Sequence, residues 1–175
     1  IEPKGITIAF DTAEPTFRHK EDPNYKANRD VAPDIFFQDL DKLEEILKES
    51  LNLSICKAPG YEADDVLGIL ATEPTNEERI IVSIDKDLLQ IPGKVSRDGK
   101  TFEVISEDEA NYWHMMQTLT GDSTDGYSGC PKVGVKTAQK ILGDHIQVPI
   151  LDLWMRVLAA YAKVGYSTDE ALAQA

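Results

Sequence analysis

The stretch Arg79-Ile80-Ile81-Val82-Ser83-Ile84 is the most strand-like run of the chain, and Asp85-Lys86-Asp87 follows it at once. β-Branched residues favour strands because they pack well on a pleated, half-buried surface. A short apolar run of this kind predicts a buried strand. In open α/β sheets, ligands bind outside the carboxyl ends of the strands, where these two carboxylates stand. The stretch therefore predicts a sheet with buried strands and, directly after it, a candidate acidic site.

Strands and helices alternate on both sides of this stretch. We expect further strands over 5–10, 54–58, 94–97 and 101–105, with Asp98-Gly99 as the turn of a hairpin between the last two. Helical spacing of apolar residues, together with Ser106/Glu109 and Ser167/Glu170 as capping boxes, predicts helices over 35–53, 61–72, 106–119, 135–142 and 149–164. This alternation predicts an α/β fold with a parallel sheet flanked by helices.

The segment over 12–34 shows no periodicity and holds three prolines, so we expect a long loop or irregular arch. Loops of this length are commonly functional or disordered. Its part from Arg18 to Arg29 interleaves basic and aromatic residues, which suits the backbone and bases of a single-stranded nucleic acid. A solvated, flexible loop is the alternative interpretation.

Acidic residues gather in four small groups where an apolar run stops or a turn begins. The eight residues are Asp11; Glu62, Asp64 and Asp65; Asp85 and Asp87; and Asp122 and Asp125. Like charges in one cleft raise each other's pKa and destabilise the fold, a conflict that divalent cations relieve. Mg²⁺ takes oxygen ligands, usually a few carboxylates with water and substrate phosphate. Taken singly, each residue also fits a solvated charge or a helix-start carboxylate. Taken together, they predict metal-dependent phosphate chemistry.

Composition limits the classes of protein that remain. The chain has 175 residues, is 42% hydrophobic and carries a formal net charge of −13. No run of ~18 apolar residues predicts a membrane span, and no secretory leader is visible. Cys56 and Cys130 stand alone without metal-ligand spacing, which is typical of a reducing compartment, so we expect a cytoplasmic protein. If so acidic a chain contacts DNA, the contact has to depend on local basic patches and metal ions.

The amino-acid composition of the chain changes after Gly121. Residues 121–134 are rich in Gly and Ser, and the predicted helix over 135–142 follows them. Backbone amides at a helix N-terminus bind phosphate. Positive charge is available within or just before this predicted helix, from Lys132, Lys136 and Lys140. We expect phosphate binding around Gly134 to Ala138, with an ordinary turn into a helix as the alternative.

Four motifs in this order resemble one protein family. They are Phe10-Asp-Thr-Ala-Glu-Pro-Thr-Phe-Arg-His-Lys20, Gly60-Tyr-Glu-Ala-Asp-Asp-Val-Leu67, Ile84-Asp-Lys-Asp-Leu-Leu-Gln90, and Thr120-Gly-Asp-Ser-Thr-Asp-Gly126 followed by Val133-Gly-Val-Lys-Thr-Ala138. Over about residues 5–143 the chain resembles the 5′→3′ exonucleases and flap endonucleases, which include the 5′-nuclease domain of bacterial DNA polymerase I. Residues 22–29 and 121–129 are most similar to exonucleases of short-tailed phages.

The resemblance implies a PIN-like α/β core over residues 1–120 with an arch at about 14–33, and a helix-three-turn-helix module within 121–175. It implies two Mg²⁺ or Mn²⁺ ions held by the eight acidic residues, and a K⁺ ion in the module. The implied catalytic residues are Asp11, Glu62, Asp64, Asp65, Asp85 and Asp87, with Lys26 and Arg29 meeting the scissile phosphate. The expected DNA contacts are Phe17, Arg18, Tyr25, Lys26, Arg29, Lys132, Gly134, Lys136 and Thr137.

The implied activity is removal of nucleotides or short flaps from DNA 5′ ends by a monomer, in replication, primer removal or repair. The substrate would be a 5′ end, a flap, a nick or an RNA–DNA hybrid. The family opens with a strand bearing one further metal-binding Asp, which nothing before Asp11 supplies, so we expect a fragment or a truncated form. A catalytically weak DNA-structure-binding module is therefore one alternative. A different Mg²⁺ phosphotransferase or an RNA-cutting PIN domain is another, against which the helix-three-turn-helix segment argues.

Overall fold

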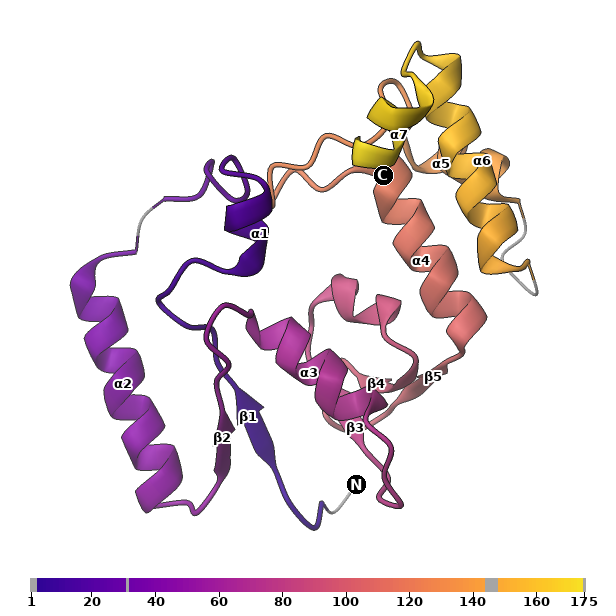
Figure 1. Cartoon of the computed structure of the whole chain (residues 1–175). Coiled ribbons are helices and arrows are strands. Elements are labelled where there is room, and N and C mark those ends of the chain that lie inside the picture. Colours follow the sequence, from indigo (N-terminus) through magenta and orange to yellow (C-terminus); the bar gives the residue numbers. More distant parts are fainter. Residues whose placement is uncertain (1–2, 31, 144–147, 175) are drawn as a thin grey trace. The chain divides into compact units, whose positions relative to one another are not determined.

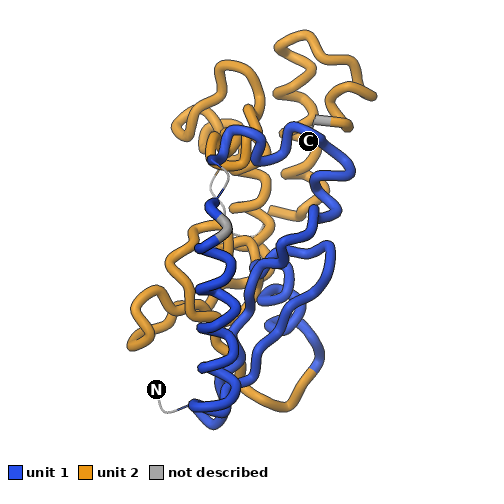
Figure 2. The backbone as a smooth tube through the Cα atoms, turned by 90° about the vertical axis from the view of Figure 1, so that its left-hand side faces the viewer, with its two compact units in different colours: residues 1–74 blue, residues 75–175 orange. Residues whose placement is uncertain are grey.

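The computed structural model describes residues 3–30, 32–143 and 148–174 (Figure 1). It divides the chain into two compact units, Ile1–Pro74 and Thr75–Ala175 (Figure 2). This boundary differs from the division expected after residue 120, which was a functional division and stays a prediction. Residue 31 of the expected arch lies outside the described residues.

The first unit is built on a pair of parallel strands, β1 (Thr7–Ala9) and β2 (Ser54–Cys56). Parallel strands need a long crossover connection, and here it contains α1 (Phe17–Glu21) and α2 (Asp34–Glu49). The helix α2 contacts β2, and α3 (Ala63–Thr72) contacts β1. The predicted strands and helices of this unit are confirmed, although α2 and β2 each end earlier than expected.

The expectation of an irregular segment over 12–34 is wrong for α1. The buried Thr16 is the N-cap of this short helix, and its hydroxyl lies 2.9 Å from Nδ1 of His19. The backbone N–H of Phe17 donates to the carbonyl of Gly60 at 2.9 Å. A helix of five residues is too short to show apolar periodicity, and contacts remote in the sequence hold it.

The second unit begins with a mixed sheet. Strand β3 (Ile80–Val82) pairs in parallel with β4 (Gly93–Ser96), which pairs in antiparallel fashion with β5 (Glu103–Ile105). A short 3-10 helix, η1 (Lys86–Gln90), connects β3 to β4. The strand predicted around residue 81 and the hairpin are confirmed. The described strands form two sheets, and β5 adds an antiparallel strand to the expected parallel pairing.

The hairpin turn is organised by the carboxylate of Asp98. It accepts hydrogen bonds from the backbone N–H groups of Lys100 and Thr101, both at 2.8 Å, and from the hydroxyl of Thr101. These hydrogen bonds favour the ionised form and lower the pKa of Asp98 to about 2.

We therefore expect Asp98→Ala to lower the Tm at pH 7, because two backbone donors lose their acceptor. A carboxyl with a depressed pKa contributes stability above its ordinary pKa of 3.8 and loses it as the pH falls through about 2. The Tm difference between wild type and variant should therefore shrink from pH 5 towards pH 2, as measured by differential scanning calorimetry. A constant difference over this range would contradict the assigned role of the carboxylate.

Four helices complete the second unit: α4 (Glu107–Thr120), α5 (Val135–Leu142), α6 (Ile150–Lys163) and α7 (Thr168–Gln174) (Figure 1). Their core contains the fully buried Leu119, Leu142, Val157 and Tyr161. The capping box of Ser106 and Glu109 is confirmed at the start of α4. Over the part of the chain that the structure describes, we find no helix with both the length and the apolar character needed to cross a bilayer.

Candidate functional site

The first acidic cluster lies at the N-terminus of α3 in the first unit. Glu62 is the N-cap residue, and its backbone N–H donates to Oδ2 of Asp65 at 2.9 Å. Asp11 follows β1 and accepts a hydrogen bond from the backbone N–H of Ala63 at 2.7 Å. A helix N-terminus stabilises nearby negative charge through its free N–H groups and its dipole. The fold therefore brings Asp11, Glu62 and Asp65 to one helix end.

Side chains of the arch reach the same carboxylates. Arg18 donates two hydrogen bonds of 2.7 Å to the carboxylate of Asp65, a bidentate geometry, and lies 3.8 Å from Glu62. Glu62 accepts hydrogen bonds from the hydroxyl of Tyr25 at 2.8 Å and from Nζ of Lys26 at 2.6 Å. Three residues predicted to contact DNA, Arg18, Tyr25 and Lys26, therefore contact the first acidic cluster itself.

The carboxyl groups of this cluster differ in pKa. The hydrogen bonds from Arg18 hold the pKa of Asp65 below its ordinary value. Burial raises the pKa of Asp64, and the negative charges of Glu62 and Asp11 raise it further. Asp64 thus lies in a partly buried position where negative charge is in excess. Carboxylate oxygens are the ligands that a hard divalent cation such as Mg²⁺ prefers.

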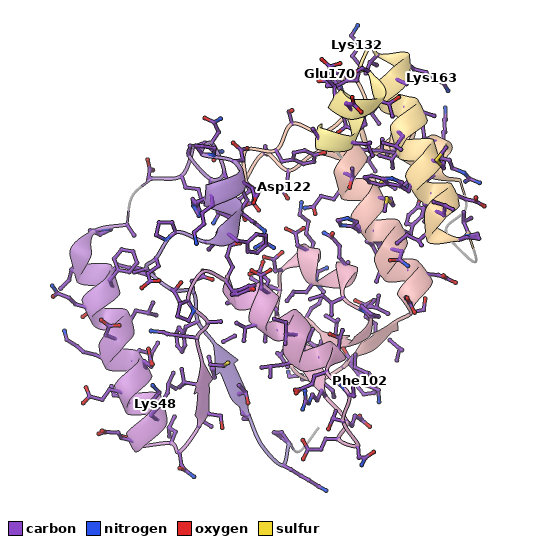
Figure 3. The ribbon with its side chains drawn as sticks, viewed as in Figure 1. Lys48, Phe102, Asp122, Lys132, Lys163 and Glu170 are labelled. Atoms are coloured by element: carbon purple, nitrogen blue, oxygen red, sulfur yellow. The ribbon has the colours of Figure 1, made fainter. Side chains whose placement is uncertain are left out.

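The second acidic cluster lies in the second unit, around η1 and the end of α4. Asp85 is the N-cap of η1 and accepts a hydrogen bond from the backbone N–H of Asp87 at 2.9 Å. Asp122 lies in the loop after α4 (Figure 3), and its side chain is buried. Nζ of Lys86 lies 3.0 Å from Oδ2 of Asp122 and supplies a counter-charge to it. Asp87 and Asp122 are thus brought together from η1 and the loop after α4.

The carboxyl groups of the second acidic cluster also differ in pKa. Burial raises the pKa of Asp87, and the charges of Asp85 and Asp122 raise it further. Burial would also raise the pKa of Asp122, but the hydrogen bonds from Lys86 and from the backbone N–H of Thr124 outweigh it and hold the pKa at about 2. Asp122 is therefore ionised at neutral pH, beside a carboxyl whose charge is disfavoured.

The loop that carries Asp122 and Asp125 is tightly closed. Asp122 and Tyr127 exchange backbone hydrogen bonds of 2.7 and 2.9 Å across it. Gly121 and Gly129 cross with their backbones in contact, since a Cβ atom on Gly129 would lie 2.3 Å from the nitrogen of Gly121. Both glycines have a positive φ. This crossing fixes the direction in which the chain carries Asp122.

Within the described ranges, no three His, Cys, Asp or Glu side chains form a group that could hold a metal ion. The carboxylates instead face Arg18, Lys26 and Lys86. Assignment of the eight acidic residues as metal ligands therefore stays a prediction, as does convergence of all four groups.

The remaining predicted DNA contacts lie on the surface. Phe17 and Arg29 in the arch are exposed. Gly134 is the N-cap of α5, and Lys132, Lys136 and Thr137 near it are exposed as well. The side chain of Lys132 points outward (Figure 3). Exposure fits a role in binding DNA, which stays a prediction for these residues.

Sequence reasoning missed Gln117 and Gln90. Nε2 of Gln117 donates to Oδ1 of Asp87 at 2.9 Å and to Oδ2 of Asp122 at 3.1 Å, so one amide joins the two carboxylates. Gln90 in turn contacts Gln117 and His114. His114 lies on a helix, as predicted. Its spacing of three from Gln117 places the two side chains on one face of α4, and this spacing was the signal that could have paired them.

Comparison with known proteins places this geometry in context. Residues 1–117 match the family model described as the N-terminal, resolvase-like domain of 5′-3′ exonuclease. The chain is 37% identical over 166 residues to DNA polymerase I of Synechocystis sp., covering 82% of this chain and 17% of that protein. It is 37% identical over 147 residues to a 5′-3′ exonuclease of Buchnera aphidicola, covering 77% of this chain and 51% of that protein. It is also 36% identical to the exodeoxyribonuclease of Enterobacteria phage T3, covering 79% of this chain and 47% of that protein.

Solved structures support the fold. A bacteriophage T5 flap endonuclease in complex with DNA and metal ions superposes with a TM-score of 0.65 at 15% identity, covering 98% of this chain and 72% of that chain. A T5 protein crystallised with metal ions gives a TM-score of 0.67 at 16% identity, with 98% of this chain and 74% of that chain covered. The chain spans about half the length of the exonucleases it matches. The α/β fold is thereby confirmed, and the helix-three-turn-helix module stays a prediction.

Proposed function

This chain belongs to the 5′-3′ exonuclease family, and on that premise we propose that it hydrolyses phosphodiester bonds at DNA 5′ ends with the help of divalent cations. The observation that carries the proposal is the contact between the arch and the first acidic cluster. Arg18, Tyr25 and Lys26 reach Glu62 and Asp65 directly. Side chains suited to a phosphate and carboxylates suited to a cation are therefore adjacent within one unit.

The arch side chains have the chemistry that a single-stranded 5′ end requires. Arg18 and Lys26 supply positive charge, and each lies over a neighbouring aromatic ring, Phe17 at 4.6 Å and Tyr25 at 4.9 Å. Aromatic faces stack on bases and cations bind phosphates, so the combination suits a strand without sequence preference. We propose that Phe17, Arg18, Tyr25, Lys26 and Arg29 bind the DNA, with Lys26 and Arg29 at the scissile phosphate.

The cation sites follow from the donor sets. Asp11, Glu62, Asp64 and Asp65 would hold one Mg²⁺ or Mn²⁺ ion in the first unit, and Asp85, Asp87, Asp122 and Asp125 would hold another in the second. When bound, such ions lower the pKa of a water ligand and stabilise the leaving oxygen. The carboxylates would orient the ions, and Arg18 and Lys26 neutralise part of the clustered charge through their ion pairs with Asp65 and Glu62.

Duplex DNA would bind at a second place. The N-terminus of α5, with Gly134, Lys132, Lys136 and Thr137 exposed, offers backbone amides and positive charge to a phosphate. We propose it as part of a helix-three-turn-helix module that also binds K⁺. The preference for 5′ ends, flaps, nicks or RNA–DNA hybrids, action as a monomer, and the role in replication or repair are further parts of the proposal. They rest on the family relationship.

Asp85→Asn tests the proposal with little disturbance of the fold. Asn caps a helix about as well as Asp, so η1 should remain. We expect Mg²⁺-dependent cleavage of a 5′-labelled flap to fall by at least ~100-fold, because the neutral amide is a poor ligand for a hard cation. DNA binding, measured by fluorescence anisotropy, should stay within about threefold. The matched control is Asp108→Asn on the exposed first turn of α4. Equal loss of cleavage and binding would indicate a structural role for Asp85 instead.

A further inference from the structure

A continuous row of hydrogen bonds links the second acidic cluster to a surface histidine. Asp87 and Asp122 both accept from Nε2 of Gln117. Oε1 of Gln117 pairs with Nε2 of Gln90, and Oε1 of Gln90 lies 2.9 Å from Nδ1 of His114. Gln90 is the last residue of η1, whereas His114 and Gln117 lie on α4. The row thus ties together two elements that are in contact.

The two carboxylates at one end determine the direction of every bond in the row. Oδ1 of Asp87 and Oδ2 of Asp122 both accept from Nε2 of Gln117, so Gln117 presents its amide NH₂ group to both carboxylates. Oε1 of Gln117 then has to accept from the NH₂ group of Gln90. Oε1 of Gln90 is then an acceptor and needs a donor. Nδ1 of His114 must therefore carry a proton. Any other orientation places two acceptors or two donors against each other.

We infer that Gln117 is a positioning residue that holds Asp87 and Asp122 together for cation binding, and that Gln90 and the Nδ1–H form of His114 lock its amide. This inference rests on the proposed function. Side chains that hydrogen-bond to metal ligands orient those ligands, and their loss commonly costs about 10–100-fold in metal affinity.

Burial supports Gln117 as the main link. Another side chain on Asp122 is that of Lys86, which is 66% exposed, so its ammonium competes with water for the carboxylate. Gln117 is half-buried on α4 between the buried Met116 and Thr118. Its backbone is fixed by a helix whose side chains form part of the core of this unit. Gln117 therefore has less freedom than Lys86 and determines the separation of the two carboxylates.

Binding of Mn²⁺ to the intact protein, followed by electron paramagnetic resonance, tests the positioning role without relying on cleavage. We expect Gln117→Leu to weaken the Mn²⁺ affinity about 10–100-fold and to lower kcat while the KM for DNA stays within about threefold. Gln90→Glu keeps the acceptor for His114 but removes the donor to Gln117, so a smaller loss of affinity is expected. The matched control is Gln139→Leu on the exposed face of α5, which should bind Mn²⁺ like wild type.

The histidine end provides a second measurement that needs no metal. Long-range ¹⁵N–¹H spectra at pH 7.5 should show neutral His114 with its proton on Nδ1. His114→Asn keeps a donor near that atom and should retain most of the Mn²⁺ affinity, whereas His114→Leu should lose part of it.

Two results would overturn the inference. One is wild-type Mn²⁺ affinity in a folded Gln117→Leu variant, with folding checked by circular dichroism, and the other is an unprotonated Nδ1 on neutral His114. Failure of the wild-type protein itself to bind Mn²⁺ would instead contradict the proposed function, and the positioning role would fall with it. The ¹⁵N measurement would then still decide the direction of the hydrogen bonds.

Discussion

Asp64→Asn is expected to reduce metal-dependent cleavage by at least ~100-fold while leaving the Tm unchanged or higher. Burial and the charges of Glu62 and Asp11 raise the pKa of Asp64, so the folded state disfavours its ionised form. A neutral amide of the same shape removes this repulsion and removes a cation ligand in the same step. Loss of activity without loss of stability is the pattern expected of a residue retained for chemistry.

The control is Asp39→Asn on α2, where an exposed carboxylate pairs with the exposed Lys42 at 2.9 Å. Such surface pairs contribute about 0–1 kcal/mol, so neither Tm nor activity should change much. Tm is measured by differential scanning calorimetry and activity by release of label from a 5′-labelled flap. A marked fall in the Tm of Asp64→Asn would contradict this prediction, because it would show that the ionised carboxylate stabilises the fold.

Gly129→Ala is expected to destabilise the second unit by about 3–5 kcal/mol and to abolish cleavage, because it combines overpacking with backbone strain. The added Cβ would lie 2.3 Å from the nitrogen of Gly121 and 2.6 Å from the carbonyl carbon of Thr120. Both are backbone atoms, so no side-chain rotation relieves the overlap. The loop must open, and Asp122 then loses its bridge to Tyr127.

Gly99→Ala is the matched control for this substitution. Gly99 also has a positive φ of 70°, but a Cβ there meets nothing within 4 Å. Gly99→Ala should therefore lower the free energy of unfolding only by the cost of placing alanine in the left-handed conformation, about 1 kcal/mol. Urea denaturation of the two variants separates the free-energy cost of the steric overlap from that of the left-handed backbone conformation. Equal destabilisation of both variants would contradict the close crossing of Gly121 and Gly129.

The sequence predicted the elements whose stability is local. The β-branched run around Ile81, the Asp98-Gly99 turn and the capping box at Ser106 all depend on neighbours within a few residues, and the structure confirms each of them. The positions of the acidic groups also followed from local pattern, because each lies where a strand, helix or turn begins or ends.

The parts that the sequence did not predict depend on distant partners. The helix α1 depends on the carbonyl of Gly60 and on Asp65, which is 47 residues away from Arg18 in the chain. Gln117 gains its role from Asp87, 30 residues away. Amphipathic periodicity describes one element at a time, so it carries no information on which polar side chain of a helix meets which carboxylate of another segment.

The most direct test of the account is a polarity assay on the intact protein. A duplex with a single-stranded 5′ flap is labelled at the 5′ end in one sample and at the 3′ end in another, and each is incubated with Mg²⁺, Mn²⁺ or EDTA. The account predicts that short labelled products appear from the 5′-labelled strand with either metal and that EDTA prevents their release. Absence of 5′-end cleavage with both metals, or cleavage that persists in EDTA, would contradict it.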